Sequence, residues 1–296
     1  MISTEPRIDA LLPGEMARRA EYVGVSKAEA PTFSMFSLAV LAGAYIALGA
    51  VFATTVSAGT SADWPYGVSR LLSGLVFSLG LILVVVGGAE LFTGNTLIAR
   101  AWASKKVTTR SMMRNWIVVY LGNLVGSLGT AVLMLASQQH TFGDGSVGVT
   151  ALGIANAKVG LDFWQAVALG VLCNALVCMA VWLTYSARST VDKIAAIIFP
   201  IAAFVAAGFE HCVANMYFIP MGLLIKAFDP SFAAAAGLDL GGLTWGSFLV
   251  HNLIPVTLGN IIGGTVLVAA VYWSVFLGWK NPSTIPAGSG SSGTAP

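Results

Sequence analysis

The stretch GFEHCVANM, residues 208–216, places a glutamate and a histidine side by side at the end of an apolar run. It matches an earlier stretch, GAELFTGNT at 88–96: both read G-x-E with an Asn five residues after the Glu, and they lie 120 positions apart. Downstream, YLGNLVGS at 120–127 matches TLGNIIGG at 257–264, at an offset of 137 positions. The chain therefore contains an internal repeat, and its second copy is 17 residues longer between these landmarks.

The composition is that of a membrane protein. Of the 296 residues, 56 % are hydrophobic and 9 % are charged, whereas soluble domains carry about 25 % charged residues. Six stretches without Asp, Glu, Lys or Arg are long, or nearly long, enough to cross about 30 Å of hydrocarbon as helices. They begin near Phe33, Leu71, Asn115, Phe163, Ile194 and Ser247. We expect an all-α membrane protein with six transmembrane helices over residues 33–280.

The basic residues predict the orientation. Twelve of the 15 lie before the first span, between the second and third, between the fourth and fifth, or after the sixth. The other three are Arg70, Lys158 and Lys226. By the positive-inside rule both termini face the cytoplasm. A net charge of +2 gives no reason to expect a nucleic-acid partner.

The two ends of the chain differ from the apolar middle. Residues 1–32 mix apolar and charged side chains and lack a cleavable signal pattern, which predicts an amphipathic segment at the cytoplasmic interface. Residues 281–296, rich in Ser, Gly and Pro, are predicted to be disordered. The three cysteines, an odd number, all fall in spans and are expected to be reduced.

The repeat predicts an inverted architecture. Its halves, about 33–135 and 160–280, each hold three spans, so the second half must enter the membrane from the opposite face. In transporters of this plan, matching interrupted helices meet near the bilayer midplane. An interrupted helix exposes backbone polar groups that need partners in hydrocarbon. Four polar residues are well placed to supply them, with or without touching a substrate: Glu90, Asn95, Glu210 and Asn215.

His211 has no counterpart in the first half. The equivalent position there is Leu91, so the interruption itself does not require an imidazole. An ionisable group inside the membrane is by default a functional hypothesis, and the alternative is a hydrogen-bonded core histidine. The sequence has no cofactor motif and no cluster with metal-ligand spacing, so we expect neither a cofactor nor a metal.

The motifs LFTGNT, GFEHCVANMYFIPMG and NLIPVTLGNIIGG resemble those of the formate/nitrite transporter family, and DALLPGEMARRAEYVGVSKA resembles its formate-channel branch. The resemblance covers about residues 7–280. It implies an aquaporin-like inverted 3+3 repeat with two broken helices, assembled as a pentamer with one pore per protomer. The Asn-Pro-Ala motifs of aquaporins are absent, which argues against a water or glycerol pore.

The resemblance also implies roles for particular residues. His211 resembles the family's central pore histidine and Thr93 its hydrogen-bonding partner. Lys158 resembles the vestibule lysine that draws anions in; its alternative is an ordinary loop lysine. Leu91, Phe92, Glu90, Glu210, Asn215, Asn174 and Asn260 are expected to line the pore or support its loops, although Asn260 can also be read as a helix-packing residue.

Apolar constrictions are implied at Phe77, Leu81 and Phe204, where the alternative is ordinary packing. Phe77 and Leu81 are one turn apart and share a helix face. Phe204 precedes His211 by seven residues, which on a continuous helix places it about 10 Å away along the axis. His251 departs from the formate-channel pattern and receives no role, and neither does His140.

The predicted function is a formate channel or formate/proton symporter in the bacterial cytoplasmic membrane, with formate and related small monovalent anions, protons, membrane lipid and its own copies as partners. A dry pore excludes a bare carboxylate but admits the neutral acid, so a histidine that protonates the substrate between two apolar constrictions suits this task. Alternatives are a nitrite or hydrosulfide channel of the same family and a non-transporting structural or regulatory membrane protein. An enzyme is not expected, because the sequence lacks a nucleophile or cofactor motif.

Overall fold

The computed structural model describes residues 10–60 and 64–278, and these ranges contain helices and no strand. The predicted tail at 281–296 and the first nine residues lie outside the described ranges. Five helices in the described part are long and apolar enough to cross a membrane: α2 (Thr32–Ser57), α3 (Tyr66–Gly87), α6 (Thr109–Ala136), α8 (Phe163–Thr184) and the continuous run Trp245–Gly278. The sequence predicted six.

The predicted fifth span accounts for the difference. The segment expected to begin near Ile194 is divided into α9 (Thr190–Ala206) and α10 (Cys212–Phe228), each of 17 residues. A helix of this length rises about 26 Å, which is short of the hydrocarbon thickness. The count of six spans therefore stays a prediction.

Shorter elements connect the long helices. They are α1 (Pro13–Glu29), α4 (Phe92–Asn95), α5 (Ala99–Ala103), α7 (Ser146–Val159) and α11 (Pro230–Ala235), with 3₁₀ turns at Thr96–Ile98 and Gln139–Thr141. The last run consists of α12 (Trp245–Ser247), α13 (Ile254–Ile262) and α14 (Val271–Trp273), separated by π-helical segments at Phe248–Leu253 and Gly263–Ala270 and followed by another at Ser274–Gly278. The Gly- and Ala-rich segment 227–246 contains α11.

Glycines allow the helices of each half to pack closely in the same way. Helix α2 packs on α6, and α8 packs on α13. A Cβ added at Gly126 of α6 would overlap the backbone carbonyl of Val40, and one added at Gly263 would overlap that of Val171. Close approach of small residues is the usual means of helix association in lipid. The two glycines are 137 positions apart, the same offset as the sequence repeat.

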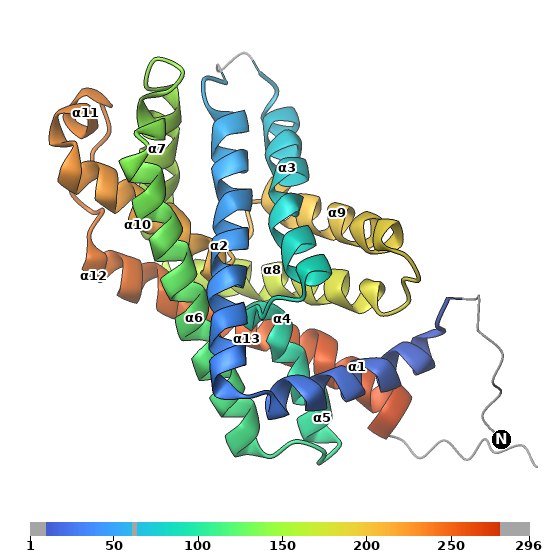
Figure 1. Cartoon of the computed structure of the whole chain (residues 1–296). Coiled ribbons are helices and arrows are strands. Elements are labelled where there is room, and N and C mark those ends of the chain that lie inside the picture. The colour runs from blue at the N-terminus through green and yellow to red at the C-terminus, as the bar shows by residue number, and fades with distance from the viewer. Residues whose placement is uncertain (1–9, 61–63, 279–296) are drawn as a thin grey trace, which may run out of the picture.

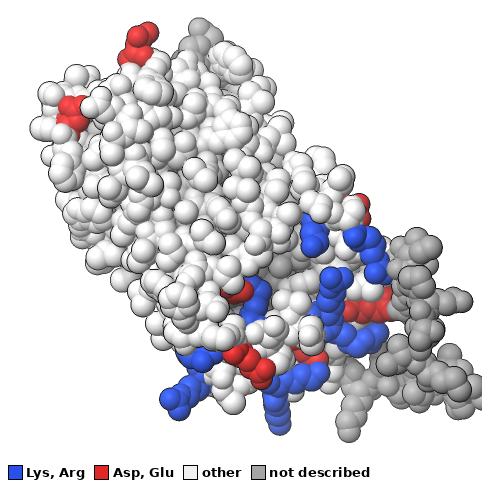
Figure 2. Space-filling model, viewed as in Figure 1, with Lys and Arg blue, Asp and Glu red and all other residues white. Residues whose placement is uncertain are grey.

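Helix α1 lies across the end of the bundle where α5 also lies (Figure 1). It buries Met16, Ala17 and Ala20 against Trp182 of α8. On the face drawn in Figure 2, the Lys and Arg side chains gather at this end, while the middle of the molecule carries almost none. This segregation is the pattern on which the predicted orientation depends.

Candidate functional site

The helical backbone is interrupted at both copies of the repeated stretch. Helix α3 ends at Gly87, Gly88 has a φ of 74°, and helix resumes at Phe92 of α4. Helix α9 ends at Ala206, Gly208 has a φ of 76°, and helix resumes at Cys212 of α10. The positive φ is a conformation that glycine adopts without strain, so the two glycines at equivalent positions permit the same break in the helix.

Asn123 of α6 holds the backbone of the first interruption. Its Oδ1 accepts a hydrogen bond from the Phe92 N–H at 2.9 Å. Its Nδ2 donates to the Ala39 carbonyl at 2.7 Å and to the Glu90 carbonyl at 2.9 Å. One fully buried amide therefore satisfies a donor and an acceptor that the broken helix leaves without helical partners.

Asn260 of α13 does the same for the second interruption. Its Oδ1 accepts from the Cys212 N–H at 2.9 Å, and its Nδ2 donates to the carbonyls of Gly170 at 2.8 Å and Glu210 at 2.9 Å. These bonds favour the loop-supporting reading of Asn260 over the helix-packing one. The expectation that the repeated Glu and Asn residues satisfy the broken backbone is wrong, because their side chains bond mainly to one another and to lysines.

The first of these polar networks joins α1 to the first interruption. Lys27 Nζ lies 2.8 Å from Glu90 Oε1 and donates to Asn95 Oδ1 at 3.0 Å. Asn95 Nδ2 donates to Glu90 Oε2 at 2.6 Å and to Asn115 Oδ1 at 2.9 Å. Asn115 in turn donates to the Lys27 carbonyl at 3.0 Å, which closes the ring of bonds.

The second network repeats the first with the equivalent residues. Lys158 Nζ lies 2.7 Å from Glu210 Oε1, and Asn215 Nδ2 donates to Glu210 Oε2 at 2.6 Å and to Asn252 Oδ1 at 2.7 Å. Asn252 Nδ2 donates to the Lys158 carbonyl at 2.9 Å. Because both copies keep the lysine, the glutamate and two asparagines, the repeat is visible in side-chain chemistry as well as in sequence.

His211 is the polar residue that breaks this symmetry. It is 3 % exposed, and its Nε2 lies 2.9 Å from Thr93 Oγ1. Its Nδ1 accepts the Ala214 N–H at 3.1 Å and so caps the N-terminus of α10. A nitrogen that accepts an amide hydrogen carries no proton, so the hydrogen-bond network assigns the proton of the neutral ring to Nε2, which donates to Thr93.

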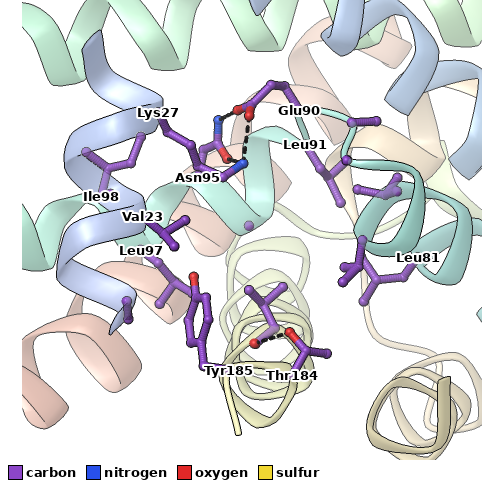
Figure 3. Close-up of a pocket in the computed structure, with 18 of the residues that line it drawn as sticks. Val23, Lys27, Leu81, Glu90, Leu91, Asn95, Leu97, Ile98, Thr184 and Tyr185 are labelled. Carbon is purple, nitrogen blue, oxygen red and sulfur yellow. Dashed lines mark hydrogen bonds and ion pairs between the residues drawn. The ribbon is translucent and has the colours of Figure 1, made fainter. Parts of the chain in front are cut away.

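A cavity of about 270 Å³, here called the Lys27 cavity, opens at the α1 end of the bundle. Its charged lining residues are Arg19, Lys27, Glu90 and Lys193. Figure 3 shows Lys27, Asn95 and Glu90 grouped on one side of it and Leu81 on the other. Its apolar lining includes Leu81 and Leu91.

A second cavity, here called the Lys158 cavity, measures about 90 Å³. Its charged or ionisable lining residues are Arg70, Lys158, Glu210 and His211, and its lining also includes Phe77 and Phe204. Lys158 Nζ lies 5.4 Å from the centre of the Phe218 ring, a cation–π contact within the same cavity.

Between the two cavities lies a void of about 10 Å³. It shares Leu81 and Leu91 with the Lys27 cavity, and Phe77, Phe204 and His211 with the Lys158 cavity. A void needs about 10–15 Å³ to hold one water, so this one holds at most a single molecule. His211 is its one polar lining residue, and the rest of the lining is aliphatic or aromatic.

Four expected site residues lie outside the lining of these three spaces: Thr93, Asn260, Phe92 and Asn174. Phe92 packs edge-to-face against Tyr120 of α6, with ring centroids 4.9 Å apart, and lines an apolar surface groove instead. Asn174 is fully buried and donates to the carbonyls of Asn260 at 2.6 Å and Thr93 at 3.2 Å. It therefore supports the loop that carries Thr93 and lines none of the three spaces.

The helical spacing expected between Phe204 and His211 is wrong. Helix α9 ends two residues after Phe204, and the turn that follows brings the histidine back beside it. The two ring centroids are 6.0 Å apart with the rings nearly parallel, closer than the two-turn separation that a continuous helix requires. Phe77 completes the cluster, with its ring centroid 5.7 Å from that of Phe204.

Two histidines without an assigned role differ in their surroundings. His251 is exposed. His140 is 4 % exposed, and its Nε2 lies 3.3 Å from Asp229 Oδ2, so it links the turn after α6 to the end of α10. Hydrogen bonds from the Phe232 backbone and then from His140 lower the pKa of Asp229 below its ordinary value.

The sequence analysis missed several residues of the site: Lys27, Asn115, Asn123, Asn252 and Arg70. Extending the match of YLGN with TLGN five residues toward the N-terminus would have paired Asn115 with Asn252. Arg70 carries no such signal, because only the fold brings it to the cavity. Among the described residues, no group of three or more His, Cys, Asp or Glu side chains could hold a metal ion.

Comparison with known proteins identifies the family. The formate/nitrite transporter family model matches residues 14–274, most of the chain. The chain belongs to the formate/nitrite transporter family. Formate channel FocA of Escherichia coli (strain K12) is 46 % identical over 273 residues, which cover 91 % of this chain and 95 % of that protein. A probable formate transporter of Methanothermobacter thermautotrophicus is 41 % identical over 284 residues, covering 90 % and 97 %.

Solved structures of family members share the fold. One, described as a pentameric formate channel with formate bound, is 49 % identical, has a TM-score of 0.78 and aligns over 83 % of this chain and 98 % of its own. Another, described as an FNT family ion channel, is 28 % identical with a TM-score of 0.76 over 88 % and 98 %. The predicted family membership and the helical membrane fold are confirmed, and the chain is an integral membrane transport protein rather than an enzyme.

Proposed function

We propose that this chain is a channel for formate and other small monovalent weak-acid anions, working as a homopentamer with one pore in each protomer. The observation that carries the proposal is the row of two cation-lined cavities separated by a void of about 10 Å³ whose one polar lining residue is His211. Relatives named as formate channels, and a solved relative described as pentameric with formate bound, support this choice of substrate and assembly.

The void selects by the cost of removing water from a charge. A carboxylate loses its hydration at Leu81, Leu91, Phe77 and Phe204, and a bare ion in such surroundings costs many kcal/mol. The neutral acid carries no net charge and avoids most of that cost. An anion that gains a proton at the void therefore crosses, while a permanently ionised species such as chloride is held back.

His211 is the group proposed to supply that proton. In the described state both ring nitrogens bond to the protein, so an anion reaches the Nε2 hydrogen only when the bond to Thr93 opens. Full proton transfer also requires the ring to hold a second proton on Nδ1, in place of the Ala214 N–H bond. The imidazolium passes its Nε2 proton to the carboxylate, which leaves a neutral ring protonated on Nδ1 and a neutral acid. Acidification favours this sequence.

The two cavities are proposed to face opposite compartments. The charge pattern supports an orientation with the Lys27 cavity toward the cytoplasm of a bacterial cell and the Lys158 cavity outward. Lys27 and Lys158 line these cavities and attract anions toward the void from either side. Each is paired with a glutamate, which keeps the anion from binding too tightly to leave.

The test is flux of formate, nitrite, hydrosulfide and chloride into liposomes that contain purified protein, measured from about pH 4 to about pH 8. We expect formate to pass, chloride to lag, and formate flux to rise as the outer pH falls. Faster nitrite or hydrosulfide flux would reassign the substrate within the family. Equal chloride flux without pH dependence would refute the proton-assisted pore, and no flux of any anion would favour a structural or regulatory protein.

A further inference from the structure

Arg70 is the second cation of the Lys158 cavity, and neither the repeat nor the family motifs point to it. It lies in the second turn of α3, and its side chain reaches the C-terminal end of α9. Its Nη2 donates to the Val205 carbonyl at 2.6 Å, and its Nε is buried without an acceptor. The guanidinium is partly exposed and lines the cavity on the same side of the void as His211.

The charge balance of the cavity depends on Arg70 rather than on Lys158. Lys158 Nζ lies 2.7 Å from Glu210 Oε1, so this pair contributes no net charge. Arg70 makes no ion pair with any described residue, and its other contacts are a carbonyl and the Tyr66 ring at 6.0 Å. With His211 neutral, the cavity therefore carries one uncompensated positive charge, and that charge belongs to Arg70.

Two hydroxyl groups lie in the lining of the same cavity. Ser57 Oγ of α2 and Ser73 Oγ of α3 are 2.6 Å apart. Ser57 Oγ is also 2.8 Å from the Ala53 carbonyl, and Ser73 Oγ is 2.9 Å from the Ser69 carbonyl. The two hydroxyl hydrogens thus have three possible bonds: one to each carbonyl and one between the hydroxyls. If one hydrogen turns to a ligand, the other can still bond to one of the two carbonyls.

We propose that Arg70, together with the hydroxyls of Ser57 and Ser73, forms a recognition site for the carboxylate of a small monocarboxylate anion, which binds there before it meets the Phe77–Phe204 barrier. The inference deepens the proposed function and rests on it. Guanidinium presents planar paired donors that match the two oxygens of a carboxylate, whereas spherical halides use only one. The Lys158 cavity, of about 90 Å³, holds several waters or one such anion.

The site assigns separate tasks to the two cations. Arg70 selects a planar anion, whereas Lys158 in the same cavity is already paired with Glu210. Because the attraction of Arg70 acts on binding rather than on passage across the apolar barrier, its loss should change the concentration dependence of flux more than the maximal rate.

The experiment compares wild type with Arg70→Gln, Arg70→Lys and Ser73→Ala in liposomes, with formate supplied on the Lys158 side. Arg110→Gln, an exposed cation in the turn that begins α6, is the matched control. We expect the half-saturating formate concentration to rise about tenfold in Arg70→Gln, equivalent to about 1.4 kcal/mol, with the maximal rate changed less than about twofold. Arg70→Lys should lie between Arg70→Gln and wild type, and Arg110→Gln should match wild type.

Arg70 also donates to the Val205 carbonyl, so its replacement can disturb folding. Arg70→Gln must therefore first elute from size-exclusion chromatography as a single symmetric peak. If it does not, Arg70→Lys and Ser73→Ala decide the matter, since both keep most of the local bonds. Unchanged half-saturation in these variants, or an equal change in Arg110→Gln, would overturn the site. Formate-induced thermal stabilisation of the detergent-purified protein, with chloride as the comparison, reports binding without flux. Wild type that carries no formate refutes the proposed function, whereas wild type that carries it with no dependence on Arg70 refutes only this site.

Discussion

Replacement of His211 by asparagine should separate its capping role from its proton chemistry. The structure gives His211 two bonds: Nδ1 caps α10 through the Ala214 N–H, and Nε2 bonds to Thr93. Loss of an N-cap costs about 0.5–2 kcal/mol, and loss of an ordinary hydrogen bond costs about 0.5–1.5 kcal/mol. His211→Ala loses both, about 1–3.5 kcal/mol in all. Asparagine is a preferred cap, so His211→Asn should lose only the Thr93 bond.

Neither variant can take up a proton at the void. We expect both to lose the rise of formate flux at acidic pH, while the thermal midpoint of the purified protein falls clearly in His211→Ala and little in His211→Asn. The assay is formate flux against pH in liposomes, after subtraction of flux into protein-free liposomes. If His211→Asn keeps the wild-type pH profile, the proton comes from bulk water and the proposed role of the histidine is wrong. If both variants lose stability equally, the capping geometry is wrong.

Three further results are expected. Asn260→Ala removes three buried hydrogen bonds and should lower the thermal midpoint strongly, at about 1–3 kcal/mol for each polar group left without a partner. A midpoint within error of wild type would show that Asn260 does not hold the second interruption. Leu81→Ala should join the Lys27 cavity to the void and raise chloride flux relative to formate, and an unchanged ratio would place the barrier elsewhere. The pKa of Asp229 is lowered by hydrogen bonds from the Phe232 backbone first and then from His140. The ionised carboxylate therefore stabilises the fold above the ordinary carboxyl pKa of about 4, and this contribution is lost as the pH falls through the lower folded pKa. Asp229→Asn should therefore flatten the loss of thermal stability below about pH 4, and an unchanged acid profile would exclude this pair as its source.

The positions of the two interruptions were predictable because the repeat marks them twice. A glycine, a glutamate and an asparagine recur at one offset, and the polar side chains of a Glu–Asn pair in an apolar run need hydrogen-bonding partners. Lys158 was expected from the family resemblance, but its pairing with Glu210 and the role of Lys27 were not, because both lysines lie outside the repeat boundaries of about 33–135 and 160–280. The lysine–glutamate pairs come from the tertiary contact of α1 and α7 with the interruptions.

Sequence spacing alone predicts the wrong separation of Phe204 and His211. Seven residues on a continuous helix separate two side chains along its axis, but here the helix is broken around Gly208 and the His211 ring stacks on Phe204. A one-dimensional pattern encodes periodicity within an element and cannot encode the path of a turn. The same limit applies to Arg70, which reaches the cavity because α3 packs against α9.

Comparison of the two halves of the repeat separates the residues that support the broken helices from the residue proposed to act on the substrate. Each half has its own asparagine bonded to the broken backbone, its own lysine–glutamate pair and its own positive-φ glycine. These shared features are what an interrupted helix needs to persist in the membrane. At the N-cap position of the resumed helix the halves differ: Leu91 in the first, His211 in the second. Since Leu91 serves that position without a side-chain cap bond, the imidazole is not required by the backbone. The most economical explanation for a histidine at a void with no other polar lining is chemistry on what passes through it.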